Sequence, residues 1–94
     1  MKFLTEFKKY LDEKDRVKVW PSKRKIKLLV LEYLASKFEE GLYYSEKEVN
    51  IILNEFHTFS DPCLLRRELY AYGFLARTKD TSKYWKIVSN LNFG

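Results

Sequence analysis

Two adjacent arginines, Arg66 and Arg67, carry the most specific chemistry in this chain of 94 residues. A guanidinium group forms paired hydrogen bonds with a phosphate or with the edge of a guanine base. Tyr70 follows three positions after Arg67, so on a helix the two side chains share a face, and the tyrosine hydroxyl can donate to a phosphate. These three residues indicate contact with an anionic polymer such as duplex DNA.

A second group of basic residues follows in the C-terminal part of the chain, where lysine ammonium groups can contact phosphates as point charges. Together, the candidate DNA-binding residues are Arg66, Arg67, Tyr70, Lys79, Lys83 and Lys86. Both arginines have an alternative role, because they can also form ion pairs with the acidic residues Glu46 and Glu48. Tyr70 has one as well, since an exposed tyrosine is often only a surface aromatic.

Catalytic and metal-binding chemistry finds little support in the sequence. One histidine, His57, and one cysteine, Cys63, cannot supply the ligand set of a zinc site, and a single cysteine cannot form an internal disulfide. Paired carboxylates at a useful spacing, a glycine-rich phosphate loop and a nucleophile beside a base are all missing. We therefore expect no metal, no cofactor and no enzymatic activity, and we expect His57 to cap a helix end or to pack on Phe59.

The net charge of +5 arises from 18 basic and 13 acidic side chains, and it is unevenly distributed. Residues 1–25 carry +5, residues 26–60 carry −3 and residues 61–94 carry +3. The basic ends favour an anionic partner, while the acidic middle repels one. This acidic segment is the main observation against DNA binding.

Nothing in the sequence indicates a membrane or an export route. The longest apolar run, Leu28–Leu31, is far shorter than the roughly 20 residues that span a bilayer. The N-terminus alternates charged and aromatic residues and lacks the apolar region of a signal peptide. We therefore expect a cytoplasmic protein without membrane contact.

An amphipathic helix is predicted at the N-terminus, where apolar side chains recur at helical spacing. Its apolar stripe consists of Phe3, Leu4, Phe7, Tyr10 and Leu11. Residues 12–16 then turn the chain, and residues 17–20 form an extended connector anchored by Trp20. The simplest role of this helix is to cover the apolar surface of the helix that follows.

A central helix is predicted from the N-cap Ser22 to about Phe38, because apolar residues cover most of its circumference. Gly41 supplies a left-handed stop after it, and residues 42–44 form a small strand.

Two further helices are predicted, joined by the four residues 57–60. A capping box at residues 45–48 opens the first helix, which leaves Ile51 exposed. Asp61–Pro62, an N-cap followed by proline at the first helical position, opens the second. The outer face of that second helix carries Cys63, Arg66, Arg67 and Tyr70, and Gly73 ends it.

The chain closes with a predicted hairpin, in which residues 74–78 and 83–88 flank the polar turn 79–82. This order of elements is that of a winged helix-turn-helix. We therefore predict a mainly α fold with a small β-hairpin, a winged helix-turn-helix with an N-terminal amphipathic helix. The second helix of the pair would be the recognition helix, and the hairpin would be the wing. The predicted divisions are residues 1–20 for the N-terminal helix and connector, 21–88 for the domain and 89–94 for a tail.

Several short motifs resemble those of a bacterial family. They are Trp20-Pro21-Ser22-Lys23-Arg24, residues 44–50, His57-Thr58-Phe59 with Asp61, residues 65–69, and residues 77–80 with Tyr84-Trp85. From about Leu11 to Lys86, the chain is identified as a member of domain-of-unknown-function family 2087. Members of this family occur alone or at the C-terminus of bacterial helix-turn-helix regulators, so the resemblance implies a regulatory context without a biochemical role.

The chain departs from the family pattern where glycine is usual, at Asp15, Ser60 and Thr81, and where aromatic residues are common, at Pro62-Cys63. The departure at Thr81 matters most, because this residue lies in the predicted wing turn. A tight left-handed turn is less favoured without glycine, so the resemblance implies a wing tip that is looser or differently shaped.

These observations favour a duplex-DNA-binding protein, a regulator of transcription or an accessory domain of one. The alternative is a winged-helix module for protein interaction or dimerisation without DNA binding, which the acidic middle segment would suit. The contact with a second copy would then use the N-terminal helix or the exposed face at Ile51.

Overall fold

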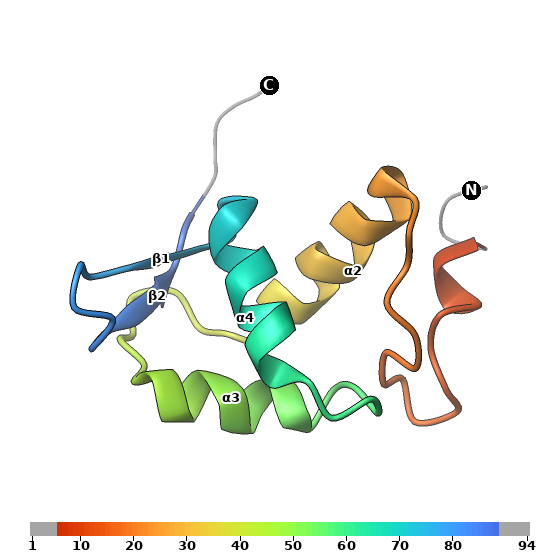
Figure 1. The fold of residues 1–94 in the computed structure, drawn as a ribbon, viewed down its shortest axis with the longest axis horizontal. Coiled ribbons are helices and arrows are strands. Elements are labelled where there is room, and N and C mark those ends of the chain that lie inside the picture. Colours follow the sequence, from red (N-terminus) through yellow and green to blue (C-terminus); the bar gives the residue numbers. More distant parts are fainter. Residues whose placement is uncertain (1–5, 89–94) are drawn as a thin grey trace.

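The computed structural model describes residues 6–88, so the predicted tail 89–94 and the stripe residues Phe3 and Leu4 lie outside the described part. A helical turn at residues 6–8 precedes the elements α2 (Arg24–Ala35), α3 (Glu46–Asn54), α4 (Pro62–Ala71), β1 (Leu75–Arg77) and β2 (Tyr84–Lys86) (Figure 1). The described chain is mainly helical with an antiparallel hairpin of two strands, as predicted. Its arrangement is compatible with a small winged-helix-like fold.

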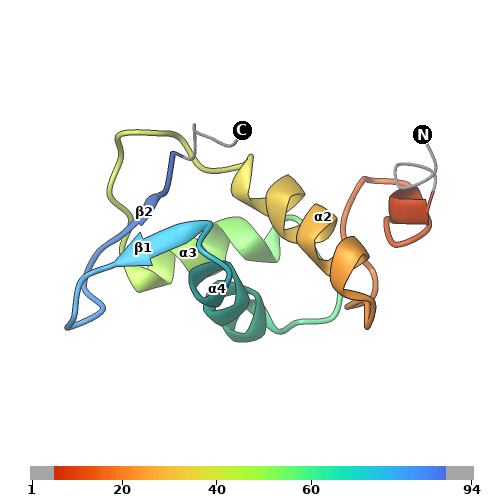
Figure 2. The same cartoon turned by 90° about the horizontal axis from the view of Figure 1, so that it is seen from above.

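The core forms where α4 contacts both α2 and α3. Its enclosed aliphatic side chains include Ile26, Val30, Leu31, Leu34, Val49, Leu53, Leu65 and Leu69. Burying one such side chain contributes about 1.5–3 kcal/mol relative to leaving it exposed. Leu75 of β1 and Tyr84 of β2 join the same core, which attaches the hairpin to the helices. The hairpin and the helical turn at residues 6–8 lie at opposite ends of the molecule in two perpendicular views (Figure 2).

Helix α2 begins one residue later than predicted. Its N-cap is Lys23, which has an extended backbone and makes no side-chain capping hydrogen bond, and the prediction of Ser22 as the cap is wrong. Pro21 is fully buried just before it, and the helix starts only after the extended Lys23.

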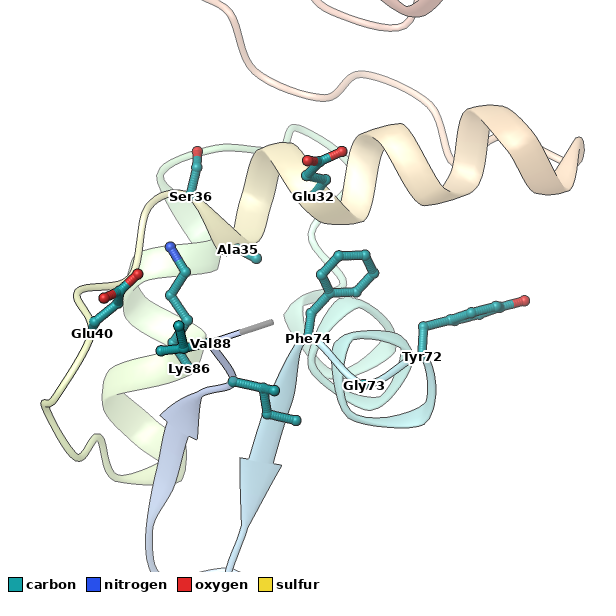
Figure 3. Close-up of a pocket in the computed structure, with 10 residues that line it drawn as sticks. Glu32, Ala35, Ser36, Glu40, Tyr72, Gly73, Phe74, Lys86 and Val88 are labelled. Carbon is teal, nitrogen blue, oxygen red and sulfur yellow. The ribbon is translucent and has the colours of Figure 1, made fainter. Parts of the chain in front are cut away.

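The α-helical hydrogen bonds of α2 also end earlier than predicted. Phe38 N donates to Ala35 O at 3.1 Å, an i→i−3 bond, so the buried Phe38 continues the apolar pattern in a tighter turn beyond the helix. Gly41 has the predicted left-handed conformation, with φ 82°, but it lies in the loop and not at the helix end. Lys86 extends from β2 toward this end of α2 and donates to Phe38 O at 3.4 Å (Figure 3).

The small strand predicted at residues 42–44 is reduced to a single residue. Tyr44 and Tyr84 form an antiparallel bridge with two backbone hydrogen bonds of 2.8 and 2.7 Å. Leu42 and Tyr43 remain exposed beside it. Backbone pairing between the loop after α2 and β2 is therefore limited, among the described residues, to the bridge at Tyr44.

Both helix starts predicted for the helix pair are confirmed. Ser45 and Glu48 form the reciprocal hydrogen bonds of a capping box at the start of α3. The side chain of Asp61 caps α4, and Pro62 occupies its first turn. Ile51 is exposed on α3, as the helical spacing predicts.

His57 joins the two helices from within the turn between them. Its buried imidazole has Nδ1 2.7 Å from Leu53 O, and its Nε2 accepts the Asp61 N–H at 2.9 Å. Because a backbone N–H only donates, Nε2 carries no proton and Nδ1 is the donor. The ring meets Phe59 edge to face at 4.7 Å. The expectation that His57 caps a helix end or packs on Phe59 is confirmed on both counts.

The N-terminal segment packs on α2 and on the turn between α3 and α4. Val17 is fully buried, its N–H donates to Phe56 O at 2.7 Å, and its carbonyl accepts the Thr58 N–H at 2.9 Å. Phe7 meets Tyr33 of α2 edge to face at 5.6 Å. The predicted covering role is thus confirmed within the described residues, and Val17 adds a buried anchor that the alternation of the connector did not single out.

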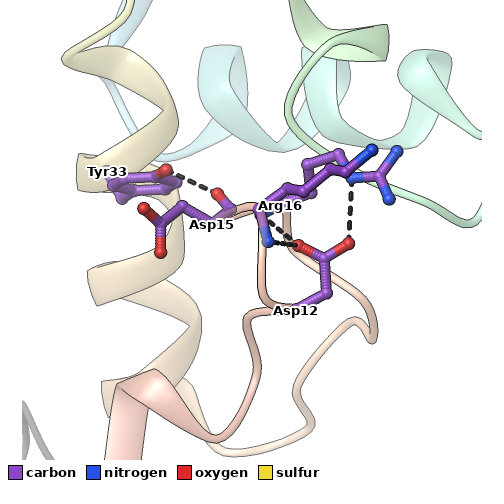
Figure 4. Close-up of polar contacts among 5 residues, drawn as sticks. Asp12, Asp15, Arg16 and Tyr33 are labelled. Carbon is purple, nitrogen blue, oxygen red and sulfur yellow. Dashed lines mark hydrogen bonds and ion pairs between the residues drawn. The ribbon is translucent and has the colours of Figure 1, made fainter.

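A polar loop at residues 12–16 makes the predicted turn (Figure 4). Asp12 accepts the backbone N–H of Arg16 at 2.8 Å and its Nε at 2.9 Å. The backbone hydrogen bond from Arg16 is the main reason that the pKa of Asp12 lies below its usual value. The Tyr33 hydroxyl donates to Asp15 O at 2.6 Å, which attaches the loop to α2.

Among residues 6–88, three residues other than glycine adopt a left-handed backbone: Asp15, Ser60 and Thr81, with φ of 61°, 56° and 60°. These are the three positions at which the resembled family pattern has glycine. Aspartate tolerates this conformation better than most residues, whereas the branched Cβ of threonine makes it strained. The three turns therefore carry local strain, which is greatest at Thr81.

Candidate nucleic-acid interface

The outward face of α4 and the hairpin meet in a hollow of ≈ 420 Å³. Its lining residues, which together define what we call the arginine groove, are Glu46, Arg66, Arg67, Tyr70, Arg77, Thr81 and Tyr84. All three candidate residues from α4 line the groove. The three candidate lysines do not.

Arg77 is the groove residue that the site prediction missed. Its guanidinium carbon lies 4.2 Å from the centroid of the Tyr70 ring, and such a contact contributes about 0.5–1 kcal/mol at an exposed site. Arg77 follows the buried Leu75 by two positions on β1, so strand alternation places both side chains on one face of the hairpin. That spacing was the signal in the sequence. Arg67 is exposed on α4 and opens on the same groove.

Arg66 does not lie on the outer face of α4, and this part of the prediction is wrong. The residue is only 9% exposed, and its Nη2 lies 3.0 Å from Glu46 Oε2. Its Nη1 donates to Asn50 Oδ1 at 2.6 Å and to Cys63 Sγ at 3.7 Å. The long side chain folds back to α3, which the angular position of its Cα does not predict. The alternative role of Arg66, an ion pair with Glu46, is confirmed.

The buried guanidinium of Arg66 remains a cation at the base of the groove. Burial alone would lower the pKa of Arg66, but the hydrogen bond to Cys63 and the charge of Glu46 raise it above its usual value. Its Nε is buried and has no hydrogen-bond partner among residues 6–88. One N–H group of the Arg66 guanidinium, at Nε, therefore lacks an acceptor among the described residues.

The three candidate lysines lie on the hairpin but outside the groove. Lys79 is exposed in the turn, and the Nζ of Lys83 lies 5.5 Å from the centroid of the Tyr43 ring. These two lysines flank the hairpin tip. Lys86 instead faces a different hollow, apart from Lys79 and Lys83. Its bond to Phe38 O directs it toward α2, away from the arginine groove.

The second hollow, of ≈ 550 Å³, lies where the ends of α2 and α4 approach β2 (Figure 3). Its lining residues are Glu32, Ala35, Ser36, Glu40, Tyr72, Gly73, Phe74, Lys86, Ile87 and Val88. Two carboxylates and one ammonium group give this lining a net negative charge. A nucleic-acid phosphate would therefore be repelled there.

Side-chain hydrogen bonds close the hairpin tip, so the prediction of a looser tip is wrong, while a differently shaped tip stays a prediction. Thr78 Oγ1 donates to Asp80 Oδ1 at 2.7 Å, and Ser82 N–H donates to both of these side chains. The hydrogen bond from Thr78 is the largest of the effects that lower the pKa of Asp80 to about 2. The carboxylate thus organises the turn in place of a glycine, and Thr81 is held against the groove.

Comparison of the whole chain with known proteins places these residues in a family. The family described as "uncharacterized protein conserved in bacteria (DUF2087)" matches residues 16–86. The chain belongs to the DUF2087 family. No curated protein and no solved structure matches it.

The DUF2087 match begins at residue 16, later than the start at residue 11 that the resemblance suggested, and it ends at residue 86 as expected. It therefore includes Val17, the helix pair, the arginine groove and both strands. Within the described part of this DUF2087 domain, no three histidine, cysteine, aspartate or glutamate side chains are grouped to hold a metal ion. None of the helices described there is long and apolar enough to cross a bilayer.

Proposed function

We propose that this DUF2087 domain binds duplex DNA through the outward face of α4 and the hairpin, as a non-catalytic regulator of transcription or an accessory domain of one. In a winged helix-turn-helix, the second helix of the pair enters the major groove and the wing lies beside it. Arg67 from α4 and Arg77 from β1 open on one hollow between these two elements. This convergence of two guanidinium groups is the observation that carries the proposal.

The individual side chains have different roles in this proposal. Arg67 is exposed and reads a guanine edge or a phosphate, while Arg77 is oriented by the Tyr70 ring. Lys79 and Lys83 extend the positive surface around the hairpin tip. The acidic first turn of α3 opposes DNA less than its composition suggests, because one of its carboxylates is already paired with an arginine.

Fluorescence anisotropy of a labelled, mixed-sequence duplex tests the proposal. We expect a dissociation constant of about 10⁻⁴ to 10⁻⁶ M and an affinity that falls as salt is added. Arg67→Ala should weaken binding by about 1–3 kcal/mol if the residue contacts a base. Lys8→Ala is the matched control, since Lys8 is exposed in the helical turn at the end opposite the hairpin. Absence of binding at low salt up to about 100 μM, the upper end of that range, would overturn the proposal.

A protein-interaction or dimerisation module is the second candidate function, and an apolar hollow on α3 favours it. The hollow, of ≈ 190 Å³, is lined by Tyr44, Glu48, Ile51 and Ile52. Ile51 is 51% exposed there, which suits insertion of an apolar side chain from a second protein. Under this alternative, sedimentation equilibrium should show a dimer that Ile51→Lys converts to a monomer. A monomer at every concentration would contradict the dimer form of this alternative.

A further inference from the structure

We infer that the arginine groove binds a phosphoryl group, held by Arg67 and Arg77, and that Glu46 competes with this ligand for the positive charge of the groove. The phosphoryl group belongs either to a DNA backbone or to a free phosphorylated ligand. The first case rests on the proposed function, and the second does not.

The charge of the groove is unbalanced in favour of an anion. Three arginines and one glutamate line it, a net charge of +2. Glu46 is engaged with Arg66, and within residues 6–88 neither Arg67 nor Arg77 forms an ion pair with a carboxylate. Two guanidinium groups in the lining of the groove are therefore available, one from α4 and one from β1. Guanidinium pairs of this kind match the oxygen atoms of a phosphoryl group.

Arg77 is oriented for this role before any ligand arrives. Its backbone is paired with Tyr84 in the hairpin register, and its guanidinium carbon lies over the Tyr70 ring. A guanidinium has five N–H donors, so a cation–π contact with a ring leaves donors for an anion. Less side-chain freedom is then lost when an anion binds, which favours affinity.

The base of the groove supplies a third, fixed positive charge. Arg66 is buried there, and its Nε has no acceptor among the described residues. Its partner carboxylate, on Glu46, is 45% exposed and belongs to the first turn of α3. Glu46 therefore reduces the positive potential at the position where a ligand phosphoryl group would sit. Neutralising this carboxylate should strengthen anion binding.

The first experiment compares two variants of equal net charge on the full chain. Glu46→Gln keeps an oxygen for Arg66 but removes the charge, and Glu55→Gln removes the same charge at the exposed far end of α3. Inorganic pyrophosphate is titrated by calorimetry, and a mixed-sequence duplex is titrated by anisotropy, both at constant ionic strength. We expect Glu46→Gln to bind about fivefold more tightly than the parent chain, from a unit charge at contact distance. Glu55→Gln should change the affinity much less, because its charge is distant and screened.

The second experiment removes the guanidinium group that β1 contributes to the groove. Arg77→Ala should weaken pyrophosphate binding about tenfold, the effect of losing a hydrogen bond to a charged group. In the duplex titration, Arg77→Ala should also reduce the slope of the logarithm of affinity against the logarithm of salt concentration by about one, the change expected for one lost phosphate contact. The affinity of Arg77→Lys should fall between those of the parent chain and Arg77→Ala, because lysine retains the charge and loses the paired donors. Lys8→Ala is the control at the opposite end, and circular dichroism verifies that each variant is folded.

The two arms separate this inference from the proposed function. Pyrophosphate binding with the expected variant effects, together with no duplex binding, would support the arginine groove as a phosphoryl-binding site for a free ligand. The same result would overturn the proposal of DNA binding. Duplex binding that Glu46→Gln and Arg77→Ala leave unchanged would support DNA binding and overturn the groove. Equal effects of Glu46→Gln and Glu55→Gln in both arms, or of Arg77→Ala and Lys8→Ala, would also overturn it.

Discussion

Arg66 and Arg67 are adjacent in sequence, and their environments predict opposite responses to the same substitution. Arg66→Ala should lower the free energy of unfolding by about 1–3 kcal/mol, because Asn50 then loses its partner and a void opens between α3 and α4. The pair with Glu46 adds little to this figure, since its carboxylate is partly in solvent. Arg67→Ala should change stability by less than about 0.5 kcal/mol. Urea denaturation of both variants measures the difference, and equal losses would show that the two arginines share one role.

Thr81 is the residue where the backbone is most strained, and glycine should relieve that strain. Thr81→Gly should raise the free energy of unfolding by a few tenths to about 1 kcal/mol, because the left-handed penalty of a branched residue exceeds the extra chain entropy of glycine. Thr81→Ala, which keeps a side chain in the left-handed region, is the comparison and should raise the free energy of unfolding by less than Thr81→Gly does. Thermal unfolding at neutral pH is the measurement. Destabilisation by glycine would mean that the Thr81 side chain holds the tip more strongly than its backbone strains it.

Among the elements, the hairpin turn should respond to acid through Asp80. The folded pKa of about 2 lies below the ordinary 3.8, so the carboxylate stabilises the turn above pH 3.8, and this contribution is lost as the pH falls from 3.8 to about 2. Thr78→Val removes the largest cause of the shift and should move the pKa of Asp80 upward toward 3.8. An NMR titration of the Asp80 side chain in both proteins would measure this. An unchanged pKa in the variant would assign the shift to the other hydrogen bonds of the turn.

The elements differ in how far the sequence predicts them, according to whether their signals are local. The starts of α3 and α4 were predictable because Ser45 and Asp61 bond to groups within their own first turn. The end of α2 was not, since Phe38 keeps the apolar spacing while its hydrogen bond shortens to i→i−3. The residues of the candidate site also differ in whether a local sequence signal predicts their position. Arg67 follows from helical angle, whereas the burial of Arg66 depends on its contacts across to α3.

For the molecule as a whole, the N-terminal segment contributes to the shared core, and two valines in it allow a matched test. Val17 is fully buried, and Val19 is 47% exposed two positions later. Val17→Ala should lower the free energy of unfolding by about 1–3 kcal/mol through lost burial and the void that remains. Val19→Ala should stay within about 0.5 kcal/mol. If the two variants unfold alike in urea, the segment does not contribute to the stability of the core.

The hydrogen bonds that join Val17 to residues 56 and 58 also set an order for folding during synthesis. The ribosome releases the segment around Val17 first, yet its partners do not exist until all of α3 and the following turn have been made. Contacts between distant parts of a chain form late, because a long loop must close before they give any stability. Through much of the synthesis of this domain, the backbone groups of Val17 therefore lack their partners at residues 56 and 58 and pair with them only after α3 and its following turn have been made.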